Sequence, residues 1–232
     1  MTQRRRRASR GSGEQLREEI IIATKKLLAE SGRADDVSIR AVADAVGVTS
    51  PSIYLHFADK NDLLGAVVAD VFRELDDAML AGAAEAQTPM ARLFAYGLSY
   101  VQFAVSHPEQ YRIAAMDPCP TPNVEVDEVL RSSAFEHFRA TVVECIEAGI
   151  FAGGEELPIT FDLWAAAHGV ASLVIAKSYL PWGSVEDFAR RVLCAAAAGH
   201  VVATLIDEPL TPETMTEWIT VQRKAQRRRV AR

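Results

Sequence analysis

Apolar residues recur at intervals of three and four positions along almost the whole chain, and no stretch of alternating apolar and polar residues is sustained. A period near 3.6 is typical of amphipathic helices, whereas a period of two marks strands. The first such segment runs from about Glu14 to Ser31, and Gly32 supplies a helix stop. The pattern predicts an all-α protein.

Capping residues and breakers divide the rest of the chain. Ser38 is placed to cap a helix that ends before Gly47, and the next helix, about two turns long, begins at Thr49 or Ser50. Proline and glycine residues then separate longer apolar-periodic segments. The further helices that we expect cover residues 59–84, 88–106, 108–116, 125–151, 160–180 and 185–206.

The last two of these helices, at 160–180 and 185–206, are apolar nearly all round. Such helices lie either in the centre of a domain or under a second subunit. Beyond Pro209 and Pro212 we expect little order, apart from a short amphipathic helix with Met215, Trp218 and Ile219, followed by a disordered basic tail. The longest uncharged stretches are shorter than the ~18 residues of a membrane span.

The segment from Ser38 to Lys60 has the pattern of a helix-turn-helix unit. Ala43 is small where two helices cross, Gly47 permits a left-handed turn, and Ile53 enters the core between the helices. The exposed side chains of the second helix are hydroxyls and polar aromatic tips, which suit hydrogen bonds to phosphates and base edges. These are Thr49, Ser50, Ser52, Tyr54 and His56.

Charge is distributed unevenly around a formal net charge of −6. Residues 1–57 carry ten Lys and Arg against seven Asp and Glu, residues 58–222 carry nine against twenty-four, and residues 223–232 add six basic residues. A polyanion is therefore attracted to the two ends of the chain.

Several classes of protein are disfavoured. The three cysteines are widely separated and form no C-x-x-C pair, and the N-terminus lacks the apolar run of a signal peptide, which favours the cytoplasm. Nucleophile-elbow, P-loop, metalloprotease and dinucleotide-binding motifs do not occur. We expect no catalytic residue, no metal and no cofactor.

The stretch SIRAVADAVGVTSPSIYLHF, followed by a helix that opens with DKNDLL, resembles the tetracycline-repressor (TetR) family of bacterial transcription regulators. By this resemblance Tyr54 and Lys60 would contact the DNA backbone. The candidates for groove contacts would be Arg40, Thr49, Ser50, Ser52 and His56. The basic residues that members often have near Ser50–Ser52 and Ala58 are missing here, so we expect the arm residues Arg4, Arg5, Arg6 and Arg7 to supply phosphate contacts.

The C-terminal part resembles the tryptophan-histidine-glycine type of effector domain in this family, on the motif Trp164-Ala-Ala-Ala-His168-Gly169. The resemblance implies a homodimer, with 160–180 and 185–206 at its interface, and an apolar effector site between the helices. The candidate ligand-binding residues are Met79, Phe94, Leu98, Tyr111, Phe135, Phe138, Trp164 and His168. The aromatic residues are equally open to a purely structural role, and a lone histidine on an apolar helix more often bonds a buried polar neighbour or a carbonyl than a ligand.

We therefore expect a homodimeric repressor that a small hydrophobic or amphipathic effector releases from a palindromic double-stranded DNA operator, with no membrane partner. A helical small-molecule binding protein without DNA binding is the alternative, supported by the missing basic residues. The expected parts are a basic arm at 1–13, the three-helix helix-turn-helix domain at 14–60, a ligand-binding and dimerisation domain at 61–208, and a C-terminal segment at 209–232.

Overall fold

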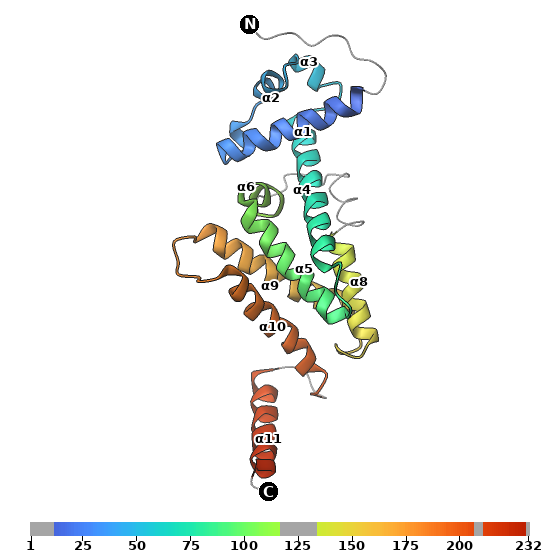
Figure 1. Ribbon diagram of the computed structural model, residues 1–232, viewed down its shortest axis with the longest axis vertical. Helices are drawn as coiled ribbons and strands as arrows, with labels where there is room; N and C mark the ends of the chain where they lie inside the picture. The colour runs from blue at the N-terminus through green and yellow to red at the C-terminus, as the bar shows by residue number, and fades with distance from the viewer. Residues whose placement is uncertain (1–11, 117–133, 207–210, 231–232) are drawn as a thin grey trace.

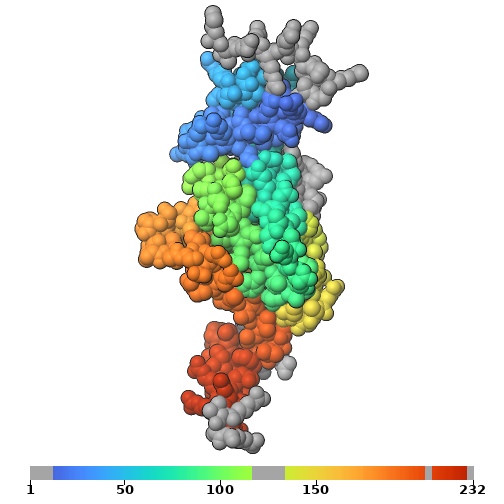
Figure 2. Space-filling model, viewed as in Figure 1, coloured from blue at the N-terminus to red at the C-terminus, as the bar shows by residue number. Residues whose placement is uncertain are grey.

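A computed structural model describes residues 12–116, 134–206 and 211–230. Every regular element within these ranges is a helix, which confirms the all-α prediction. The molecule is elongated: a small N-terminal group of helices lies at one end, a larger helical body follows, and a single helix extends from the opposite end (Figures 1 and 2). The start of the helix expected at 125–151 lies outside the described residues.

The N-terminal group begins with α1 (Ser12–Ser31), which ends where Gly32 takes a φ of 72°. Its other elements are η1 (Ala34–Asp36), α2 (Ile39–Val46) and α3 (Ser50–Ile53). The Ser38 hydroxyl accepts a hydrogen bond from the backbone N–H of Ala41, and Gly47 ends α2 with a φ of 79°. Both termini of α2 thus lie where the capping residues predict.

A compact core holds these helices together. Ala43 and Ile53 are buried at the crossing of α2 and α3, as predicted from their spacing. Leu63, Ala66 and Val67, from the first turns of α4 (Lys60–Ala83), belong to the same core. The start of α4 is therefore part of the N-terminal group. Its N-cap is Asp59, whose carboxylate accepts the backbone N–H of Asp62.

The larger body packs further helices against the remainder of α4, and its core is separate from the first one. The α5 helix lies at the centre and contacts α4, α8, α9 and α10 (Figure 1). The elements of the larger body are α5 (Pro89–Ser106), α6 (Pro108–Tyr111), the π-helical turn η2 (Arg112–Met116), α8 (Ala134–Glu147), α9 (Glu156–Ala176) and α10 (Val185–Ala203).

Several boundaries differ from the expected ones. The helix expected to continue to residue 151 ends at Glu147, because Gly149 takes a φ of 68° one turn before the Gly153-Gly154 pair. The next helix begins four residues earlier than expected, at Glu156, and ends at Ala176. The expected two-turn recognition helix has a single α-helical turn, α3, which continues as a hydrogen-bonded turn to Phe57.

The expectation that the basic tail is disordered was wrong for the residues that the structure describes. A helix, α11 (Pro212–Val230), extends through most of the tail and projects away from the body (Figure 1). Thr211 and Thr214 cap it reciprocally: the backbone N–H of each donates to the hydroxyl of the other, at 2.9 and 3.2 Å. Proline in the first turn and no internal glycine favour helix from there on.

The α9 helix is long and apolar enough to cross a membrane, with a mean hydropathy of 1.5 over its most apolar window, of which 33% is buried in this chain. Length and composition alone give this result. The helix packs on α5, α8 and α10, as a core helix of a folded domain does.

Candidate DNA-binding surface and ligand cavity

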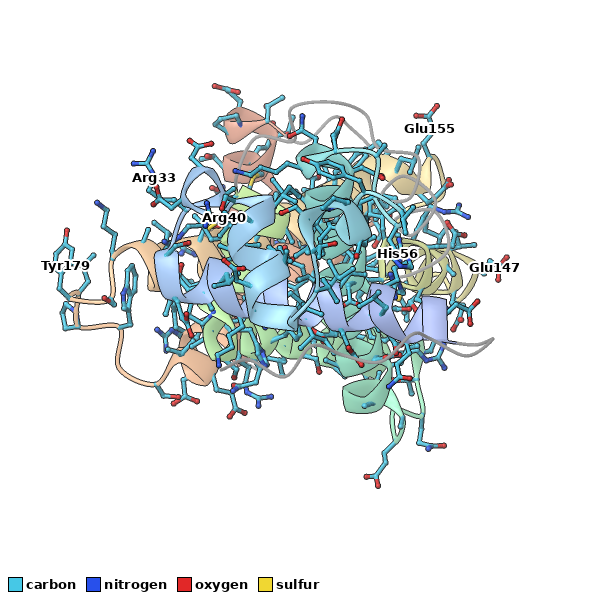
Figure 3. All side chains as sticks on the ribbon, turned by 90° about the horizontal axis from the view of Figure 1, so that it is seen from above. Arg33, Arg40, His56, Glu147, Glu155 and Tyr179 are labelled. Atoms are coloured by element: carbon cyan, nitrogen blue, oxygen red, sulfur yellow. The ribbon has the colours of Figure 1, made fainter. Side chains whose placement is uncertain are left out.

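The helix-turn-helix places its polar side chains at the free end of the molecule. Thr49 and Tyr54 are exposed, Ser50, Ser52 and His56 are half-buried, and the hydroxyls of Thr49 and Ser52 lie 2.9 Å apart. Figure 3 looks onto this end and shows Arg40 and His56 at separate points of the surface. The surface therefore offers hydroxyl, phenol and imidazole groups, with Arg40 as a flanking cation.

Two cations adjoin this surface. The Arg40 side chain is 88% exposed and lies 4.0 Å from the Asp44 carboxylate, a distance that constrains it little. Lys60 is half-buried at the start of α4, with its Nζ 3.4 Å from the carbonyl oxygen of Asp35. Both side chains can turn toward a phosphate. The arm residues Arg4–Arg7 lie outside the described residues.

A cavity of about 430 Å³ lies between α4, α5, α8 and α9 in the larger body. A volume of this order suits a small organic ligand. Its wall is almost wholly apolar and aromatic, and among the described residues the only charged side chains in it are Glu136 and Arg139 of α8. The remaining lining residues are Phe72, Leu75, Met79, Tyr96, Gly97, Tyr100, Ala134, Phe135, Phe138, Phe161, Trp164 and Ala167.

The structure brings half of the expected ligand-binding residues to this cavity. Met79, Phe135, Phe138 and Trp164 line it. The other four lie elsewhere: Phe94 packs on the core beside the cavity, Leu98 faces a shallow hollow near Ser106, and Tyr111 and His168 lie behind Tyr100.

Other lining residues were not foreseen from the sequence. Helical spacing could have indicated Phe161 as a lining residue, because Phe161 lies one turn before Trp164 on α9. Phe72 and Tyr96 carried no such signal, since only the packing of α4 against α5 turns them toward a common space.

Tyr100 connects the cavity to α6 through a buried network of hydrogen bonds. Trp164 Nε1 donates to the Tyr100 hydroxyl at 3.2 Å, and that hydroxyl lies 2.8 Å from the hydroxyl of Tyr111. The Tyr111 hydroxyl lies 2.7 Å from Nδ1 of His168, whose Nε2 lies 3.1 Å from the Ser172 hydroxyl. The network joins α5, α6 and α9.

One arrangement of protons gives every donor in this network an acceptor. Tyr100 donates to Tyr111, Tyr111 donates to Nδ1 of His168, and Nε2–H of His168 donates to Ser172. Burial keeps these groups uncharged: desolvation raises the pKa of both tyrosine hydroxyls and lowers the pKa of His168. The two tyrosines and His168 are therefore uncharged at neutral pH.

Arg139 links α8 to the first turn of α9 at the rim of the cavity. Its Nε and Nη2 donate to the two carboxylate oxygens of Glu136, and its Nη1 donates to Glu156 Oε1 at 2.7 Å. The hydrogen bonds from Arg139 lower the pKa of Glu136. The pKa of Glu156 is lowered by a hydrogen bond from the backbone N–H of Glu156 and by the hydrogen bond from Arg139. Both carboxylates are ionised at neutral pH.

Two family models match the chain. The model of bacterial regulatory proteins of the tetR family matches residues 20–67, and the model of the tetracyclin repressor-like C-terminal domain matches residues 93–196. The second match includes Trp164, His168 and Gly169, on which the resemblance to the tryptophan-histidine-glycine type depends. The two matches define a helix-turn-helix transcription regulator with a tetracycline-repressor-like C-terminal domain. The chain belongs to the tetR family.

Solved structures share the fold. A protein of unknown function from Rhodococcus sp. RHA1 is 25% identical, covering 80% of this chain and 95% of its own, with a TM-score of 0.70. The fatty acid degradation regulator FadR from Bacillus halodurans is 16% identical over 83% and 97%, with a TM-score of 0.65. RolR, solved with resorcinol, is 19% identical over 86% and 97%, with a TM-score of 0.59. The comparison with curated proteins gave no match.

Proposed function

We propose that this regulator is a cytoplasmic, homodimeric repressor whose affinity for a palindromic operator is lowered when a small apolar effector enters the cavity. The observation that carries the proposal is the course of α4. This helix begins at Lys60 within the helix-turn-helix core and reaches the cavity through Phe72, Leu75 and Met79 without a break. A ligand that moves the cavity wall therefore moves the DNA-binding end.

In this proposal α3 enters the major groove. Thr49, Ser50, Ser52 and His56 meet base edges or phosphates, and Tyr54 meets the backbone. Lys60, Arg40 and the arm residues Arg4–Arg7 supply the positive charge that α3 lacks. The recognition helix thus supplies polar contacts, and the basic residues that flank it neutralise phosphates.

The proposed dimer interface is formed by the free faces of α9 and α10. Ala195 and Ala198 of α10 are exposed in the single chain, and Leu173 of α9 is 48% exposed. A Cβ atom added at Gly169 or Gly199 meets nothing within 4 Å, so the backbone there is open to a close neighbour. Burying these apolar faces in a four-helix contact removes them from water, which explains an apolar α9 better than a membrane span does.

The coupling that we propose has a second route through α6. The Tyr111 hydroxyl is hydrogen-bonded to that of Tyr100 in the cavity wall. Two residues later, Ile113 packs on the core of the helix-turn-helix group. The α6 helix also contacts α1 directly. A ligand that displaces Tyr100 therefore acts on α1 and α4 together.

The effector that fits this cavity has an apolar body, because all but two of the lining residues that the structure describes are uncharged. That RolR was solved with resorcinol supports a small organic ligand for a domain of this fold.

The experiment starts from selection of binding sites out of a random-sequence duplex library by the full chain. The selected duplex is then titrated with protein in a fluorescence anisotropy assay, with and without decanol or decyltrimethylammonium. The proposal predicts a palindromic site and weaker DNA binding with at least one of these probes. No selected sequence, or an unchanged DNA affinity when a probe is bound, would contradict it.

A further inference from the structure

The charges at the rim of the cavity do not balance. Within the described part of the chain, Glu136 and Arg139 are the only charged side chains among the lining residues, and Arg139 also holds Glu156. This cluster has two carboxylates and one guanidinium, so its net charge is negative. Glu136 places part of this negative charge in the wall of the cavity itself.

Arg139 is poorly placed to receive an anionic ligand. Three of its N–H groups already donate to carboxylates, and it is held on two sides, by Glu136 and by Glu156. A ligand carboxylate would have to displace one of these partners or bring a third negative charge to a single guanidinium. A cation, in contrast, neutralises the cluster without breaking any of its hydrogen bonds.

Three aromatic rings adjoin this charge. The centroid of Phe135 lies 5.7 Å from that of Phe161 and 6.1 Å from that of Trp164, and the last two are 6.5 Å apart. All three rings line the cavity. With these separations, a single cation can lie within the ~6 Å of a cation–π contact from all three ring centroids.

The three rings and Glu136 lie in the wall of the same cavity. Phe135 directly precedes Glu136 on α8, while Phe161 and Trp164 follow Glu156 on α9. The ion pairs of Arg139 fix α8 and α9 relative to each other at this point. Two weak attractions for a cation, the ring faces and the excess negative charge, are thus combined at one end of an apolar cavity.

We infer that the effector is a lipophilic cation, an amine or quaternary ammonium on an apolar body. Its charged group lies against Phe135, Phe161 and Trp164 beside Glu136, and its apolar part lies deeper, against Leu75 and Met79. This inference rests on the proposed function, in which the cavity holds the effector; it adds the chemical class of that effector.

The test uses three probes with the same ten-carbon chain: decyltrimethylammonium, decanol and decanoate. Binding of each to the full-length protein is measured by titration calorimetry below the concentration at which micelles form. We expect the cation to bind about tenfold more tightly than decanol, and decanoate to bind most weakly.

Two variants on the same helix separate the charge from the fold. Glu136→Gln should weaken binding of decyltrimethylammonium about tenfold and leave decanol within about twofold. Glu144→Gln is the matched control, because Glu144 also pairs with an arginine, Arg92 at 2.6 Å, but away from the cavity. It should change neither affinity.

Equal affinity for decanol and the cation, or tighter binding of decanoate, would overturn the inference while leaving a cavity that binds effectors. An equal weakening of both ligands in Glu136→Gln would also overturn it, because the residue would then act through the fold alone. If none of the three probes binds, the inference and the effector role of the cavity fail together.

Discussion

A hydrogen bond of 2.7 Å joins the hydroxyl of Tyr111 and Nδ1 of His168 and ties the short helix α6 to α9 across 57 residues of sequence. The same hydroxyl shares a hydrogen bond of 2.8 Å with the hydroxyl of Tyr100. Tyr100 lines the cavity, so a ligand there is one side chain away from α6. The route through α6 that we propose between effector and DNA depends on this contact.

Replacing Tyr111 by phenylalanine should therefore weaken the response of DNA binding to the effector. The variant lacks two buried hydrogen bonds and should be destabilised by about 1–2 kcal/mol. Thermal unfolding measures the stability, and anisotropy with and without decyltrimethylammonium measures the response.

The control is Tyr96→Phe. Tyr96 also lines the cavity and bonds through its hydroxyl, in this case to Thr141 of α8 rather than toward α6. It should lose similar stability and keep the response. Equal responses in the two variants would show that the contact between Tyr111 and His168 plays no part in the coupling.

Gly47 is the second test, because its φ of 79° lies in the left-handed region. Gly47→Val should cost roughly 1–2 kcal/mol or more through backbone strain. The strain lies between α2 and α3, so operator affinity should fall as well. Gly149, with a φ of 68° after α8, offers a matched position far from the DNA-binding end. Gly149→Val should lower the melting temperature and leave operator affinity nearly unchanged.

Local signals predict the helix-turn-helix in detail, because caps and turns depend on neighbouring residues. Ser38, Gly47 and Asp59 each act within four residues of their own position. The network around Tyr111 offers no such signal, since its partners come from three separate helices. The cavity depends on packing in the same way, which is why the sequence predicts Phe94 in its wall and misses Phe72 and Tyr96.

The boundary between the two cores also depends on packing that local sequence signals do not show. The expected boundary at residues 60–61 coincides with the start of α4, a local event. The two cores instead divide between Val67 and Val71, because a continuous helix serves both. Only the assembled structure shows which side of α4 packs on which core.

The dimer interface is tested by a charge on α10. Ala198→Asp places a carboxylate on the exposed face of this helix and should disrupt the dimer at a cost of several kcal/mol, as expected of an unpaired buried charge. Sedimentation velocity measures the outcome at micromolar concentration. Ala140→Asp, on an exposed position of α8, should remain dimeric. A monomeric wild type would contradict the proposed dimer, and a dimeric Ala198→Asp would place the interface elsewhere.

The arm is tested by the salt dependence of DNA binding. Deleting residues 1–10 removes Arg4–Arg7 and Arg10. Each phosphate that the protein no longer neutralises lowers the slope of log affinity against log salt by ~0.9, so two or three such phosphates per subunit of a dimer correspond to roughly 4 to 5 units. Deleting residues 223–232 is the control, because α11 lies at the opposite end of the molecule (Figure 1). An unchanged slope after the first deletion would show that the arm does not contact DNA.

The most direct test of the whole account fills the cavity and measures DNA release. Ala167 lines the cavity from α9, and Ala167→Phe places a ring in the space meant for the effector. Anisotropy of the selected operator duplex is recorded during titration with decyltrimethylammonium. We predict that the cation releases DNA from the wild-type protein, whereas Ala167→Phe binds the duplex normally and does not respond. Equal release from both proteins would contradict the claim that this cavity controls DNA binding.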